Sequence, residues 1–99
     1  MGALKLEFSE RAERQLDDIL TYIALDNPDA AAKIAHEVVE ILEKVREFPK
    51  MGKSVYPKLP YRELQAYPCR IFYRRLEASI VVVAILRGEQ LLRRSMLAP

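Results

Sequence analysis

The feature that most constrains the fold is an uninterrupted run of seven apolar residues, 80–86, which Gly88 soon ends. The run is far shorter than the roughly 20 apolar residues that a membrane-spanning helix needs, so it belongs inside a globular domain. Side chains of a strand point alternately to its two faces, and both sets are apolar in this run. We therefore predict an interior strand that is covered on both sides, around which the rest of the chain must build a sheet.

The first half of the chain predicts one strand followed by two helices. Residues 4–8 alternate between apolar and charged side chains, which is the period of a short, half-buried strand. Ser9 is a good helix N-cap, and apolar residues at helical spacing extend the first helix to residue 24 or 25. Asn27 and Pro28 then end it and begin a second helix, which Pro49 stops. Because the link is so short, the helices should form an antiparallel hairpin.

The second half predicts a meander of strands. Residues 50–60 contain several prolines and lysines and indicate an irregular basic loop. Three strands follow at about 61–66, 69–76 and 80–86, and their short separators favour antiparallel hairpins. The sheet offers the only surface large enough to bury the apolar stripes of the helices. We therefore predict a two-layer α+β domain of order β-α-α-β-β-β, with arginines on the opposite sheet face and residues 90–99 as a basic tail.

Length and composition limit the class of protein. A chain of 99 residues is long enough for one domain, residues 1–99, and 51% hydrophobic residues exclude disorder. No signal-peptide pattern opens the sequence, so we expect a cytoplasmic protein. Cys69 is the only cysteine, which excludes an intramolecular disulfide. With His36 as the only histidine, the usual zinc ligand sets cannot form, and we predict neither a metal nor a cofactor.

Charge is divided unevenly between the two halves. Residues 1–48 carry six Lys/Arg against eleven Asp/Glu, a net −5, whereas residues 49–99 carry ten against three, a net +7. The formal net charge of +2 conceals this division. An acidic helical half and a basic strand half indicate a molecule with one cationic face. Its partners should be anionic, either nucleic acid or an acidic stretch of another protein.

Five short segments of the chain occur in an order and spacing that resemble a known family. They are SERA at 9–12, DNPDAA at 26–31, EFPKMG at 47–52, CRIFYR at 69–74 and VVAILRG at 82–88. Together they resemble the RelE/ParE superfamily of bacterial toxins, over nearly the whole chain up to about residue 90. The resemblance implies the toxin half of a type II toxin–antitoxin pair, a module of plasmid stabilization. Such a toxin arrests growth and is held inactive by a cognate antitoxin that wraps it.

The superfamily contains two activities, and the residues favour one of them. By resemblance, RelE-type members cut mRNA on the ribosome, with Arg70 at the position of a sheet arginine and a Tyr or His-Tyr pair in the tail. RNA cleavage through the 2′-hydroxyl needs groups that accept and donate protons. In this chain no Tyr follows Tyr73 and no His follows His36. We therefore predict a ParE-like toxin that binds and inhibits DNA gyrase and is not an enzyme.

Two alternatives stay open. One is a RelE-like, ribosome-dependent mRNA endoribonuclease that uses Arg70 with Arg62 and a lysine. The other is a degenerate toxin that acts only with its antitoxin, in autoregulation of their operon.

The predicted contact residues are the arginines of a basic sheet face and tail: Arg62, Arg70, Arg74, Arg87, Arg93 and Arg94. Arg70 and Arg74 share one strand face with Phe72 between them. They offer a docking surface for the antitoxin or the target, or else they pair with Glu63 or Glu77 across the sheet. The tail arginines are either contact residues or merely solvated. We do not expect the toxin alone to bind nucleic acid, and a homodimer or a toxin–antitoxin hetero-oligomer stays open.

Overall fold

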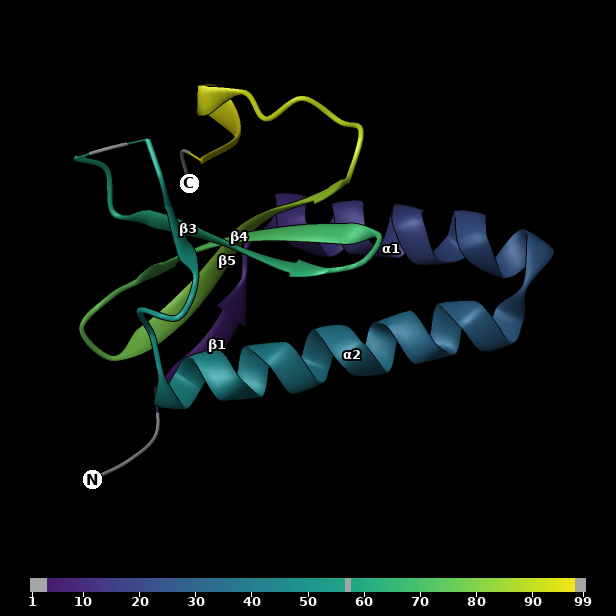
Figure 1. Cartoon of the computed structure of the whole chain (residues 1–99), viewed down its shortest axis with the longest axis horizontal. Coiled ribbons are helices and arrows are strands. Elements are labelled where there is room, and N and C mark those ends of the chain that lie inside the picture. The colour runs from purple at the N-terminus through teal and green to yellow at the C-terminus, as the bar shows by residue number, and fades with distance from the viewer. Residues whose placement is uncertain (1–3, 57, 98–99) are drawn as a thin grey trace.

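The structure, a computed structural model, describes residues 4–56 and 58–97. Its elements are, in chain order, β1 Lys5–Phe8, α1 Glu10–Asp26, α2 Pro28–Glu47, β2 Lys53–Val55, β3 Tyr61–Ala66, β4 Cys69–Arg75, β5 Ser79–Arg87 and the 3-10 helix η1 Arg94–Leu97. Within these residues the strands form one sheet of order β1-β5-β4-β3-β2. β1 runs parallel to β5, and the other pairs are antiparallel. The helices cover one face of the sheet (Figure 1), so the predicted α+β fold is confirmed.

β2 is a strand that the sequence did not predict. The irregular loop expected for residues 50–60 is wrong in part, because β2 lies within it and adds a strand to the predicted order. β2 has three residues, of which Lys53 and Ser54 are exposed, so it shows no readable alternation of apolar and polar side chains. Its pairing with β3, which sets Lys53 opposite Glu63, defines it instead. Contact with a neighbouring strand decides the conformation of this segment.

A single residue, Asn27, links the two helices and caps both of them. Its backbone N–H donates to the Ile23 carbonyl of α1 (2.8 Å), and its Oδ1 accepts from the Ala30 N–H of α2 (3.0 Å). Pro28 occupies the first turn of α2, where its missing N–H costs no hydrogen bond. The predicted helix hairpin is therefore confirmed (Figure 1). None of the described helices is long and apolar enough to cross a membrane.

β5 is buried on both faces, as its apolar sequence predicts. On one face, an inner core joins the strands to the helices and includes Val38, Leu42, Val45, Ile71, Tyr73, Ile80, Val82 and Ile85. On the other face, a smaller outer core contains Tyr61, Phe72, Val83, Ala84, Leu86 and Leu97. Leu97 belongs to η1 and is 2% exposed. The C-terminal segment thus folds back over the outer face of the sheet (Figure 1).

Hydrogen bonds to the first helix hold this C-terminal segment in place. The Arg11 guanidinium of α1 donates to the backbone carbonyls of Met96 (2.6 Å) and Ser95 (3.3 Å). Leu92 and Met96 pack against the outer core beside Leu97. The basic tail is therefore a folded part of the domain as far as residue 97.

The loop between α2 and β2 is fixed by a buried tyrosine. The Tyr73 hydroxyl of β4 donates to the Pro49 carbonyl (2.7 Å) and accepts from the Gly52 N–H (3.0 Å). A Cβ atom at Gly52 would lie 2.7 Å from that hydroxyl oxygen, a distance that favours glycine at this close approach. Burial raises the pKa of Tyr73, an effect that the Gly52 hydrogen bond and the charge of Arg62 oppose.

Candidate docking surface

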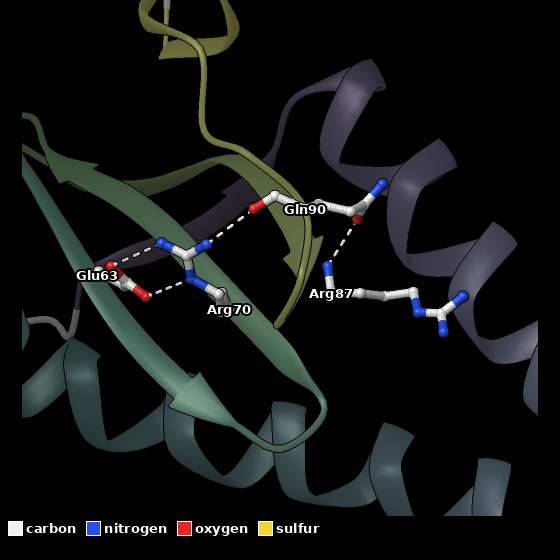
Figure 2. A network of polar contacts seen from close by, with 4 residues as sticks. All are labelled: Glu63, Arg70, Arg87 and Gln90. Atoms are coloured by element: carbon white, nitrogen blue, oxygen red, sulfur yellow. Dashed lines mark hydrogen bonds and ion pairs between the residues drawn. The ribbon is translucent and has the colours of Figure 1, made fainter.

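Arg70 lies on the outer face of β4 and is engaged by the protein itself. Its Nε donates to Glu63 Oε2 (2.8 Å) and its Nη2 to Glu63 Oε1 (3.4 Å), which joins β4 to β3. Its Nη1 donates to the Gln90 carbonyl (3.0 Å), and its guanidinium lies 5.3 Å from the centre of the Phe72 ring. The Glu63 hydrogen bond raises the pKa of Arg70. Of the alternatives that the sequence left open, the cross-strand pair with Glu63 is the one observed (Figure 2).

Arg74 shares this face, as the alternation of β4 predicts. Its guanidinium lies 5.6 Å from the centre of the Tyr61 ring. Its Nε is buried and has no hydrogen-bond partner among the described residues. It also forms no ion pair within that part of the chain. Arg74 is thus a strand arginine whose charge is uncompensated.

Arg62 does not lie with the other two strand arginines. Strand alternation puts it on the same side of β3 as Leu64, which belongs to the inner core. Its Nη1 donates to the carbonyls of Gly52 (2.7 Å) and Lys50 (3.2 Å). Through these two hydrogen bonds Arg62 stabilises the loop that precedes β2. The predicted position of Arg62 on the same sheet face as Arg70 is wrong. Successive side chains of β3 point to opposite faces, and the β3 residue on the Arg70 face is Glu63.

Arg87 closes a polar network at the end of β5. Its guanidinium lies 5.0 Å from the centre of the Tyr22 ring of α1, and its Nε is 3.1 Å from Glu89 Oε1. Its backbone N–H donates to Gln90 Oε1 (2.7 Å). Gln90 thus joins two arginines, because its carbonyl accepts from Arg70 and its side chain accepts from Arg87 (Figure 2). The network ties the start of the tail to β4 and β5.

Uncompensated positive charge lies around the outer core. Arg93 and Arg94 are exposed and form no ion pair among the described residues, and the same holds for Lys53 and Lys58 between α2 and β3. The tail and the β2–β3 hairpin both pack against the outer core. Four of the predicted arginines form no ion pair in the described structure: Arg62, Arg74, Arg93 and Arg94. Because Arg62 is hydrogen-bonded to loop carbonyls, the charge available to a partner is that of Arg74, Arg93 and Arg94.

Several side chains that organise this region carry no sequence signal. Gln90 and Tyr22 contact Arg87 from the tail and from α1. Gln15 of α1 accepts a hydrogen bond from the Ile85 N–H of β5 (2.8 Å). The 70 residues that separate Gln15 from Ile85 exceed the range of any helical or strand period. Only the three-dimensional arrangement brings these groups together.

Three other side chains that could transfer protons are a histidine, a cysteine and a buried tyrosine. His36 is exposed on α2 beside Glu40. Cys69 is buried at the start of β4, and burial raises the pKa of its thiol, which disfavours a reactive thiolate. Tyr73 is buried in the inner core. In the described structure, none of these three side chains bonds to Arg70.

Solved structures identify the fold as that of RelE/ParE toxins. One, entitled a chromosomal ParDE toxin–antitoxin system from P. aeruginosa, has a TM-score of 0.70 at 22% identity and covers 88% of this chain and 98% of that chain. The toxin–antitoxin complex RelBE2 from Mycobacterium tuberculosis has a TM-score of 0.62 at 18% identity, covering 87% and 99%. A mutant of E. coli toxin RelE in the free state has a TM-score of 0.61 at 18% identity, covering 89% and 86%.

Sequence comparison supplies the family. Residues 6–92 match the family described as ParE toxin of type II toxin-antitoxin system, parDE. A curated relative from Sinorhizobium fredii, named "Putative toxin Y4kP", is 34% identical over 90 residues, which are 91% of this chain and 94% of the relative. The chain belongs to the ParE toxin family, and the resemblance noted in its sequence is confirmed.

Proposed function

We propose that this ParE-type toxin acts by binding, that its target is DNA gyrase, and that a cognate antitoxin neutralises it. The observation that carries the proposal is the state of Arg70, whose guanidinium is bonded to Glu63 and to the Gln90 carbonyl. A guanidinium neutralised by a carboxylate is poorly suited to stabilise the charge that develops during phosphodiester cleavage. Arg74, Arg93 and Arg94 keep their charge for a partner. Such a surface complements an anionic protein face and steers association with it.

One arrangement favours a second candidate, ribosome-dependent RNA cleavage. The Glu63–Arg70 pair borders a hollow of about 290 Å³ that Tyr67 also lines. A carboxylate can accept the proton of the 2′-hydroxyl, but a second group must protonate the leaving 5′-oxygen. Tyr67 is the hydroxyl in this hollow, and it is 87% exposed. Cleavage by this arrangement would be lost in both Glu63→Gln and Tyr67→Phe.

For the antitoxin we infer a segment that combines carboxylates with apolar side chains. The carboxylates would meet the uncompensated arginines, and the apolar groups would cover Leu25 and Val39, which are 84% and 56% exposed on the helices. An interface that depends partly on charge weakens as ionic strength rises. Titration calorimetry with the antitoxin at low and high salt measures this dependence. An affinity that does not change with salt would contradict a charged interface.

A supercoiling assay with purified protein tests the target. The wild type should inhibit gyrase at micromolar concentration. The double variant Arg93→Ala/Arg94→Ala should inhibit less, because both side chains are exposed and form no ion pair with any residue that the structure describes. Lys33→Ala is the matched control, since Lys33 is exposed on α2 in the acidic half of the chain. Lack of inhibition by folded wild-type protein would exclude gyrase as the target.

Two further measurements separate the alternatives. Primer extension on cellular mRNAs after brief induction would show codon-specific cuts for the ribonuclease, and Glu63→Gln would abolish them. Induction without the antitoxin would leave growth unchanged for the degenerate toxin. The proposed gyrase inhibitor arrests growth without such cuts.

A further inference from the structure

β5 extends beyond the strand beside it. β1 pairs with β5 from Lys5 opposite Ser79 to Phe8 opposite Val82, and at Ser9 the chain turns into α1. On this side, residues 83–87 have no partner strand within the described structure. Side chains must therefore satisfy the backbone groups that β5 presents along this free edge.

A β-bulge sets which backbone groups point to the free edge. Phe72 of β4 stands opposite Ala84 and Tyr73 opposite Val82, so Val83 is an extra residue in β5. The Val83 carbonyl accepts from Ser9 Oγ (3.1 Å) at the point where β1 ends. Beyond the bulge, the N–H groups of Ile85 and Arg87 point to the free edge, and the Arg87 carbonyl accepts from the Gln90 N–H (3.0 Å).

Two glutamine side chains accept from these donors. The Ile85 N–H donates to Gln15 Oε1 (2.8 Å), and the Arg87 N–H donates to Gln90 Oε1 (2.7 Å). The donors are two residues apart, which is the spacing at which a strand presents its N–H groups to a neighbouring strand. A side-chain amide oxygen has the same hydrogen-bonding chemistry as a backbone carbonyl. The two glutamines thus occupy the positions of two carbonyls of an additional strand.

A hollow of about 290 Å³ lies between this edge and α1. Ile19 and Ile85 line it with apolar groups, and Tyr22, whose ring stacks with the Arg87 guanidinium, lines it with an aromatic side chain that is 61% exposed. Asp18 and Arg87 contribute one charge of each sign, so the hollow does not select a ligand by net charge. Its most specific feature is the pair of spaced backbone donors.

We propose that the free edge of β5 is a docking site for an extended segment of a partner polypeptide. The segment would replace the amide oxygens of Gln15 and Gln90 with two of its own backbone carbonyls and add to the sheet in line with β1. A polypeptide backbone is the ligand that presents carbonyls at this spacing, and strand addition uses this chemistry. The site uses neither Arg93 nor Arg94, and it is independent of whether gyrase is the target.

The test uses the full chain and a capped seven-residue peptide of alternating threonine and valine. Nuclear magnetic resonance titration should shift the amide signals of Ile85 and Arg87, and amide exchange at both should slow. A peptide of the same length with two central prolines is the control, because proline cannot extend a sheet. Equal shifts by both peptides, or no shift at Ile85 and Arg87, would overturn the proposal.

Variants of the glutamines give effects of opposite sign. Gln15→Ala/Gln90→Ala removes the competing acceptors and should tighten peptide binding roughly tenfold, since two modest hydrogen bonds no longer need to be displaced. Gln15→Glu/Gln90→Glu keeps the acceptors with stronger, charge-assisted bonds and should weaken binding. Gln65→Ala, at an exposed position of β3, should leave binding unchanged. If the alanine variant, shown to be folded by its melting curve, binds no more tightly than the glutamate variant, the proposal is wrong.

Discussion

Replacing Tyr73 by phenylalanine removes one oxygen atom and two hydrogen bonds. That oxygen donates to the Pro49 carbonyl and accepts from the Gly52 N–H. A hydrogen bond contributes about 1 kcal/mol net, and a buried N–H left without a partner costs about 1–3 kcal/mol. Gly52 is buried, whereas Pro49 is half-buried, so water can replace the partner of Pro49 more readily than that of Gly52. We therefore expect Tyr73→Phe to lower the free energy of unfolding by about 2 kcal/mol.

Thermal unfolding followed by circular dichroism measures this loss. For a domain of 99 residues, the entropy of unfolding is about 0.2 kcal/mol/K, so Tm should fall by roughly 10 °C. Tyr67→Phe is the matched control, because Tyr67 is 87% exposed and its hydroxyl can bond to water. Its Tm should match that of the wild type. Equal melting temperatures for the two variants would refute the argument that these hydrogen bonds stabilise the loop before β2.

Three further predictions concern alkaline pH, a helix cap and a strained loop. Burial raises the pKa of both Tyr73 and Cys69, so the folded chain holds these protons more tightly than the unfolded chain. The free energy of unfolding should therefore fall as the pH rises above the ordinary pKa values of about 8.5 for Cys and about 10 for Tyr. In Tyr73→Phe, which lacks one of the two groups, the urea midpoint should fall less steeply with pH above about 10. Asn27→Ala removes the side-chain cap of α2 and should cost about 1 kcal/mol in urea unfolding, with an unchanged midpoint contradicting the cap. Lys58 has a φ of 77°, a left-handed conformation that glycine adopts without steric cost, so Lys58→Gly should raise the free energy of unfolding by about 0.5–1 kcal/mol. Lys53→Gly, within β2, is the control and should lower the free energy of unfolding.

The helix hairpin could be predicted because its determinants are local. Ser9 and Asn27 each bond to a backbone group three residues on, so the same few residues that signal a helix start also make the contact. The apolar run of β5 similarly predicts burial on both faces, and the structure confirms it through two cores. Local sequence therefore determines these elements and the fold class.

The contacts of the arginines could not be predicted in the same way. Glu63 and Glu77 were both candidates for pairing with Arg70. The β3–β4 register places Glu63 opposite Phe72, diagonally across from Arg70, so Glu63 forms the ion pair. Register depends on the β3–β4 turn and on the core, not on the charged residues themselves. The position of Arg62 was wrong for a related reason, since its hydrogen bonds go to loop carbonyls that no sequence pattern identifies. Only the strand register and the loop positions show which arginines are bonded within the protein and which can contact a partner.

The burial of Leu97 has a consequence for how the toxin is made. The interior strand β5 and the segment that covers its outer face both come late in the chain, and β1 cannot pair until β5 has formed. While the ribosomal exit tunnel still encloses the end of the nascent chain, the helix hairpin has no sheet to pack against. The sheet therefore cannot close until the segment through Leu97 has left the ribosome, and the apolar stripes of the helices stay uncovered until then.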